Sequence, residues 1–222
     1  MSALAAKAAT ATIPIVFISD QDPVKVGLAN NLNRPDGNAT GVSQFTSELE
    51  AKRLELLREL IPNARLIAIL VNPSYPDAQT QVKQAEEAAR KFGEQLLVLK
   101  ASNVSDLEPA FATLMERRAD ALLVASDPFL SSQRNELVAL IARTGVPAIY
   151  QFRQYALAGG LMSYGTRLPD SYRQVGLYTG QILKGAKPID LPVVQSVNFE
   201  FVIKQTLLVS PFPKLYWPEP TR

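Results

Sequence analysis

The amino-acid sequence predicts an α/β fold built on mainly parallel sheets. Short apolar runs alternate with amphipathic segments along nearly the whole chain of 222 residues. Most of these runs are continuously apolar, as expected for strands that are covered on both faces. The amphipathic segments between them carry the end signals of helices. This order of elements is typical of an open sheet flanked by helices.

The predicted strands are six apolar runs. They cover residues 13–18, 65–71, 95–100, 120–125, 146–150 and 160–164. An alanine-rich segment, residues 3–9, is predicted to form a helix that leads into the first strand. That first run contains Pro14 and is followed by no small-residue cleavage motif, so the beginning of the chain does not read as a secretory signal.

The predicted helices are recognised by their ends. The expected N-terminal caps are Ser47, Asp77, Ser105 and Asp170. The two serines each begin a capping box, with a glutamate three residues later. Gly93 and Gly185 follow two of the helices, as expected at a helix C-terminus.

Three segments interrupt this pattern. Residues 33–45 are rich in Pro, Gly and Asn, and residues 186–196 are proline-rich. Both segments are predicted to be irregular connections. Residues 197–203 alternate apolar and polar side chains, which predicts a half-exposed strand. Residues 206–222 contain four prolines without any period and are expected to form an irregular tail.

The composition excludes several classes of protein. The chain has 23 basic and 21 acidic residues, a balance that argues against nucleic-acid binding. It has no histidine and no cysteine, which excludes Ser-His-Asp and Cys-His nucleophiles and zinc sites that need imidazole or thiolate. No phosphate-binding glycine motif follows a strand. We therefore expect no cofactor, no metal and no catalytic residue.

The ends of the predicted strands are the candidate binding site. In open parallel sheets, ligands bind outside the carboxyl ends of the strands. Each of these ends combines a short polar side chain with an aromatic residue or a proline, which is typical of a small-molecule site. The candidate ligand contacts are Ser19, Asp20, Asp22, Asn72, Ser74, Ser126, Asp127, Phe129, Tyr150, Phe152 and Tyr164. Each polar residue in this set could instead end a strand or cap a helix.

Four segments, in order, resemble the substrate-binding proteins of a bacterial ABC importer family that includes tryptophan-binding members. They are TIPIVFISDQDPVKVGLANNLNRPDGNATGVS, ADALLVASDPF, GVPAIYQFRQYALAGGLMSYG and YRQVGLYTGQILKGAKPIDLPVVQSVNFEFVI. The resemblance covers about residues 3–204. It implies a two-lobed type I periplasmic-binding-protein-like fold with parallel sheets.

The resemblance also assigns the segments to lobes. Residues 1–44 and 159–192 resemble a remnant of the first α/β lobe, and residues 45–158 and 193–205 resemble the second. Residues 206–222 fall outside both. Family members carry a signal sequence and further βα units before this region, so we expect the chain to be truncated at its N-terminus and its first lobe to be incomplete.

The function implied by the resemblance is that of the solute-binding component of an ABC importer. Such a protein binds a small solute, an amino acid or similar, in the cleft between its lobes without chemistry. Its partners are the solute and the ABC permease of the inner membrane, with no nucleic acid and no insertion into the membrane. The family is periplasmic, whereas a chain without a recognisable signal peptide would remain cytoplasmic. A ligand-sensing regulatory core of repressor type and a carboxylate-dependent α/β enzyme remain as alternatives.

Overall fold

The chain forms two compact units in a computed structural model that describes residues 2–44 and 49–204. One unit comprises the described parts of Met1–Leu49 and Gly165–Glu200, and the other comprises those of Glu50–Tyr164 and Phe201–Arg222. The chain therefore passes between the units after Leu49, Tyr164 and Glu200. The predicted tail, residues 206–222, lies outside the described residues.

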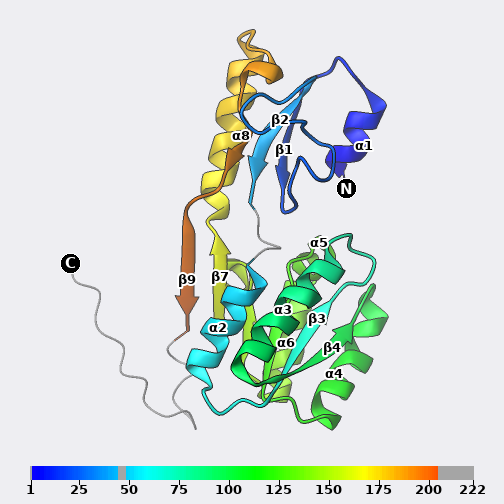
Figure 1. Cartoon of the computed structure of the whole chain (residues 1–222), viewed down its shortest axis with the longest axis vertical. Helices are drawn as coiled ribbons and strands as arrows, with labels where there is room; N and C mark the ends of the chain where they lie inside the picture. Colours follow the sequence, from blue (N-terminus) through cyan, green and yellow to red (C-terminus); the bar gives the residue numbers. More distant parts are fainter. Residues whose placement is uncertain (1, 45–48, 205–222) are drawn as a thin grey trace, which may run out of the picture. The chain divides into compact units, whose positions relative to one another are not determined.

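The first unit is built on a small parallel sheet (Figure 1). Its strands, in spatial order, are β1 (Ile15–Ser19), β2 (Ala39–Ser43) and β8 (Val194–Gln195). The helices α1 (Ser2–Ala9) and α8 (Leu168–Leu183) pack against these strands. The predicted helix at residues 3–9 and the predicted first strand are thereby confirmed.

The strand β2 corrects the prediction of an irregular connection at residues 33–45. Every residue of β2 is buried, although its sequence, ATGVS, is only partly apolar. The Thr40 hydroxyl is satisfied by donating to the carbonyl of Leu191 at 2.6 Å. Gly41 lies opposite Phe17 so closely that a Cβ atom there would be 2.0 Å from the Phe17 carbonyl oxygen. Glycine is required at this position by the close approach of β1 rather than by a turn.

The second unit contains a larger sheet. Within the described residues its strand order is β4 (Gln95–Lys100), β3 (Leu66–Val71), β5 (Ala121–Val124), β6 (Ala148–Tyr150), β7 (Met162–Thr166) and β9 (Phe199–Ile203). The pairs from β4 to β7 are parallel, and β9 runs antiparallel to β7 (Figure 1). The predicted strands in this part of the chain are confirmed, and β9 is the half-exposed strand expected within residues 197–203.

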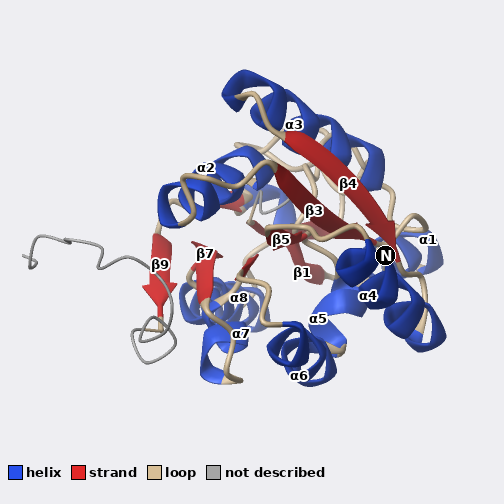
Figure 2. Cartoon of the chain, turned by 90° about the horizontal axis from the view of Figure 1, so that it is seen from below, coloured by secondary structure: helices blue, strands red, loops and turns tan. Residues whose placement is uncertain are grey.

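Helices cover both faces of this sheet (Figure 2). One face packs against α2 (Glu50–Leu60) and α3 (Ala78–Phe92), and the other lies under α4 (Leu107–Glu116), α6 (Arg134–Thr144) and α7 (Arg153–Leu157). A short helix, α5 (Pro128–Ser132), precedes α6, and 3-10 turns cover Val104–Asp106 and Pro188–Asp190. Coverage on both faces explains why Ile67 to Val71 are all buried and form a continuous apolar run.

The helix ends differ from the predicted caps in detail. Asp77 occupies the N-cap position of α3 but makes no side-chain cap hydrogen bond. The second capping box is formed by Asn103 and Asp106 rather than by Ser105. Asp170 lies inside the first turn of α8, which begins at Leu168. Ser47 lies outside the described residues, so its predicted capping box cannot be compared.

No helix among the residues described here combines the length and the apolar character that crossing a membrane requires.

Candidate functional site

The larger sheet has a topological switch point between β3 and β5. The chain leaves β3 to form β4 on one side and then returns to form β5 on the other side of β3. The connections after these two strands therefore diverge, and ligands of open α/β sheets bind at such points, outside the carboxyl ends of the strands. Asn72 directly follows β3, and Ser126 and Asp127 follow β5, so three predicted site residues gather here.

Asn72 and Asp127 are joined by a hydrogen bond across the switch point. The Asn72 side-chain nitrogen donates to Asp127 Oδ2 at 3.1 Å, and Asp127 Oδ1 accepts from the Leu130 backbone N–H at 2.7 Å. Asp127 thus caps the short helix α5, as the alternative prediction of a helix cap allowed. Burial raises the pKa of the Asp127 carboxyl above its ordinary value of 3.8, although the bonds from Leu130 and Asn72 act in the opposite direction.

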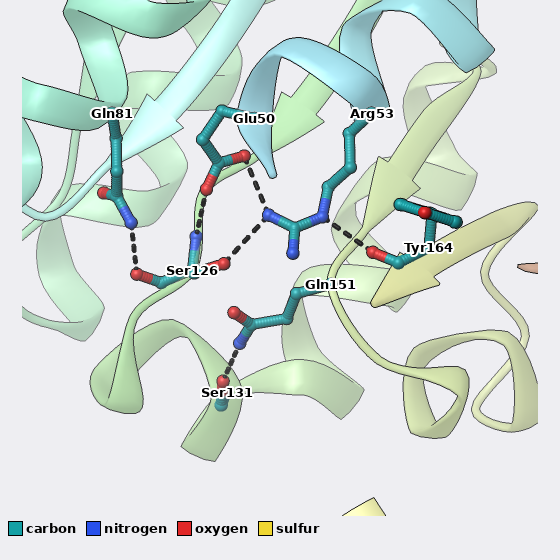
Figure 3. A network of polar contacts seen from close by, with 7 residues as sticks. All are labelled: Glu50, Arg53, Gln81, Ser126, Ser131, Gln151 and Tyr164. Carbon is teal, nitrogen blue, oxygen red and sulfur yellow. Dashed lines mark hydrogen bonds and ion pairs between the residues drawn. The ribbon is translucent and has the colours of Figure 1, made fainter. Parts of the chain in front are cut away.

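Ser126 is held by a buried ion pair from α2 (Figure 3). Arg53 Nη1 lies 2.9 Å from Glu50 Oε2, and neither side chain is exposed. The same Arg53 nitrogen donates to Ser126 Oγ at 2.9 Å, and the Ser126 backbone N–H donates to Glu50 Oε1 at 3.0 Å. Arg53 Nε also donates to the Tyr164 carbonyl oxygen at 2.8 Å. The pair therefore fixes the end of β5 and the middle of β7 against the start of α2.

Gln81 completes the support of Ser126 from the second helix on that face. Its side-chain nitrogen donates to the Ser126 carbonyl oxygen at 2.6 Å. The backbone N–H, the carbonyl and the hydroxyl of Ser126 are all engaged within the protein. The predicted role of Ser126 in binding a ligand stays a prediction. In this structure the residue is buried after the end of β5 and is hydrogen-bonded to α2 and α3.

The predicted aromatic contacts differ in position and exposure, and Tyr164 lies in the middle of β7 rather than at its end. Tyr150 is buried at the end of β6 and stacks on Tyr155 of α7, with ring centroids 4.6 Å apart. Burial raises the pKa of both hydroxyls above their usual range, so both side chains stay neutral. Phe152 is buried at the N-terminus of α7, whereas Phe129 and Tyr164 are half-buried. Those two rings have surface available for contact with a solute.

Ser74 is the exposed member of this group. Its backbone N–H donates to Asn72 Oδ1 at 3.0 Å, which places it in a turn at the end of β3. The switch point thus combines the exposed hydroxyl of Ser74, the half-buried Phe129 and the buried polar residues Asn72, Ser126 and Asp127. This is the mixture of apolar walls and few fixed polar groups that small-molecule sites require.

The remaining predicted residues lie at the carboxyl edge of the small sheet in the first unit. Ser19 Oγ donates to the Gln21 carbonyl oxygen at 2.9 Å, and Asp22 Oδ1 accepts from the Val24 backbone N–H at 2.9 Å. Ser19, Asp20 and Asp22 are all half-buried. Asp22 is engaged in a turn after β1, in agreement with the alternative that these residues end a strand. The role of all three as ligand contacts stays a prediction.

Sequence reasoning missed the buried pair in α2, although a signal for it was present. Glu50 and Arg53 are in phase with the apolar stripe of the helix, because positions 50, 53, 54, 57 and 60 share one face and are all buried. Two charged residues of opposite sign, three apart within such a stripe, indicate a buried ion pair. The partners of Arg53 are Ser126, after β5, and Tyr164, in β7. They could not be read from the sequence, since they are 73 and 111 residues away along the chain.

No cluster of three or more acidic side chains that could hold a metal ion occurs in the part of the chain that the structure describes. Among the described residues, the polar side chains of the site form hydrogen bonds, as between Asn72 and Asp127, and an ion pair, between Arg53 and Glu50.

Comparisons with known proteins agree with this architecture. A model of the family described as "ABC transporter substrate binding protein" matches residues 1–210. The tyrosine-binding protein of Clostridioides difficile (strain R20291) is 29% identical over 217 residues, which cover 93% of this chain and 59% of that protein. The chain therefore spans less than two thirds of the length of this relative.

Two solved structures are also similar. An ABC domain from Streptococcus pneumoniae in complex with L-Trp is 27% identical, with a TM-score of 0.79, over 93% of this chain and 71% of that one. A conserved domain protein from Vibrio cholerae O1 biovar El Tor is 26% identical, with a TM-score of 0.82, over 96% of this chain and 72% of that one.

Proposed function

Because the chain belongs to the ABC transporter substrate-binding protein family, we propose that it binds an aromatic amino acid and presents it to an ABC permease. The observation that carries this proposal is the switch point of the larger sheet. Asn72 and Asp127 are bonded to each other there, and the half-buried ring of Phe129 belongs to the helix that Asp127 caps. An aromatic solute fits such a site, because aromatic rings stack on one another and polar groups fix the orientation of the solute.

The relatives support the choice of solute class. One is a tyrosine-binding protein and another contains L-Trp. Both solutes combine an aromatic ring with an ammonium and a carboxylate group. We extend this class, rather than either amino acid in particular, to the present chain.

The proposed role is binding without chemical change of the solute. The family is one of substrate-binding proteins. Glu50, Arg53 and Ser126 are engaged in internal bonds that hold β5 and α2 together. We further propose that the protein acts outside the cytoplasmic membrane, where a binding component of an importer meets its solute.

Calorimetric titration with L-tyrosine, L-tryptophan, L-alanine and D-glucose tests the proposal. We expect one molecule of an aromatic amino acid to bind per chain, and recovery of the solute unchanged after long incubation, as judged by mass spectrometry. Binding of the sugar alone, or turnover of any of the four, would contradict it.

A pair of variants locates the site. Phe129→Ala should weaken binding of the aromatic amino acid about tenfold, since a ring contact of this kind contributes on the order of 1 kcal/mol beyond its buried area. Met115→Ala removes an exposed apolar side chain of the same unit, near the end of α4, and should leave the affinity unchanged. Equal affinities of the two variants for the amino acid would show that the solute does not bind at α5.

A further inference from the structure

Gln151 is a buried polar residue at the carboxyl edge that was not among the predicted contacts. It directly follows β6, and only 1% of it is exposed. The parallel register pairs Tyr150 with Ser163, so Gln151 continues the row beside Tyr164, whose carbonyl oxygen accepts from Arg53. Gln151 therefore lies in the same polar layer as the ion pair that holds Ser126 (Figure 3).

The orientation of the Gln151 amide is fixed by Ser131 in α5. The Ser131 hydroxyl donates its one proton to the Asp127 carbonyl oxygen at 2.8 Å. It can therefore only accept from Gln151, and the Gln151 side-chain nitrogen is the group that contacts it. The carbonyl oxygen of the amide is consequently turned away from Ser131, as Figure 3 shows.

This carbonyl oxygen, Oε1, is buried and has no hydrogen-bond partner within the described part of the chain. Buried polar atoms nearly always have a partner, and an acceptor left without one is costly. The missing group must be a donor, because Oε1 can only accept. Gln151 follows β6 at the carboxyl edge of the sheet, where open parallel sheets bind ligands, and it contacts a residue bonded to Asp127. A bound solute is therefore the natural source of that donor.

We propose that Gln151 is a specificity-determining residue whose Oε1 accepts a hydrogen bond from the amino group of the solute. The inference rests on the proposed function and deepens it, because an amino acid carries an ammonium group with three donors. A solute of the same shape without the amino group leaves Oε1 unsatisfied and is rejected for that reason.

The test compares two probes in calorimetric titrations of the wild-type chain and of Gln151→Met. The probes are L-tryptophan and 3-(indol-3-yl)propanoate, which has the same ring and carboxylate but no amine. Wild type should bind L-tryptophan about 10- to 100-fold more tightly, the range for a hydrogen bond that involves a charged group. Gln151→Met should lose most of this preference by weakening L-tryptophan binding while leaving the affinity for the deaminated probe unchanged.

Two further variants separate recognition from support of the fold. Ser131→Ala removes the group that orients the amide but keeps the Oε1 acceptor, so it should reduce the preference for L-tryptophan less than Gln151→Met does. Gln151→Asn retracts the amide by one methylene and should also reduce the preference, which provides the same comparison if thermal unfolding shows that Gln151→Met does not fold.

Equal losses for both probes in the Gln151 variants would overturn the assignment of Gln151 while leaving the proposed function intact. Failure of the folded wild-type chain to bind L-tryptophan or L-tyrosine would overturn the proposed function, and the inference with it.

Discussion

Arg53 and Glu50 form an ion pair in which both side chains are fully buried. Transferring both charges out of water costs several kcal/mol per ion, and only close geometry and further hydrogen bonds offset that cost. Here the 2.9 Å approach is supplemented by bonds to Ser126 and to the Tyr164 carbonyl oxygen. The stability of this region therefore depends on keeping all of these partners together.

Removing one member of the pair should lower the free energy of unfolding more than neutralising both members. We expect Arg53→Met to lower the free energy of unfolding by about 3–5 kcal/mol, because it leaves the Glu50 carboxylate buried without a counter-charge. Adding Glu50→Gln to that variant should recover part of the loss, since the amide can still accept from the Ser126 N–H. Urea denaturation measures both values.

The control for this pair lies on the same helix. Lys52 pairs with Glu55 at 2.9 Å with both side chains exposed, and Lys52→Ala should change the free energy of unfolding by less than about 1 kcal/mol. A loss for Arg53→Met as small as that for Lys52→Ala would show that the buried pair is not a structural requirement.

At the scale of elements, the end of α3 depends on a left-handed residue. Gly93 has φ of 75°, and its N–H bonds back to the carbonyls of Ala89 and Arg90. Gly93→Ala should destabilise the unit by about 1 kcal/mol, because an L-residue is strained in this conformation although space for a Cβ exists.

Gly176→Ala is the matched substitution, and it should change the stability in the opposite direction to Gly93→Ala. Gly176 lies inside α8, where no heavy atom stands within 4 Å of an added Cβ. Gly176→Ala should therefore stabilise the protein by about 0.5–1 kcal/mol. Thermal unfolding of the two variants against wild type checks both signs, and a shift in the same direction for both would contradict the argument.

The strands of the larger sheet could be predicted from the sequence because burial on both faces demands continuous apolar runs, as at Leu66–Val71. The strand β2 could not, since its burial is made possible by a partner for Thr40 at residue 191 and by the close approach of Phe17 to Gly41. Neither partner is visible in the local pattern. The helix caps failed for a related reason, because a residue such as Asp77 can occupy the capping position without forming the bond.

For the candidate site, too, the positions of residues could be predicted but their contacts could not. Strand ends such as Asn72 and Asp127 could be located from the sequence, because a strand stops where polar residues and proline begin. What each end does depends on long-range contacts, such as the Ser131 hydroxyl that orients Gln151. The assignment of segments to two lobes and the individual ligand contacts remain predictions.

For the whole molecule, the two units have cores of different size. Among the described residues, the core of the first unit is formed by Phe17, Leu28, Ala29, Ala39 and Val193. The core between the larger sheet and its helices contains Leu54, Leu57, Ile67, Ile69, Leu123, Ile149 and Met162 together with several further residues. Because stability grows with the apolar area buried, the first unit should open more often.

Native-state hydrogen exchange measures this difference directly. Backbone amides in β1 and β2 should exchange at least about tenfold faster than those in β3 and β5, since each factor of ten corresponds to about 1.4 kcal/mol of opening free energy.

A solute that binds only the folded chain should slow exchange in the unit that it contacts. Titrating L-tryptophan into the same experiment therefore locates binding without any substitution. Protection that rises around Asn72, Asp127 and Gln151 would support the switch point as the place where the solute is bound, and protection unchanged there in the presence of a bound solute would place the site elsewhere in the molecule.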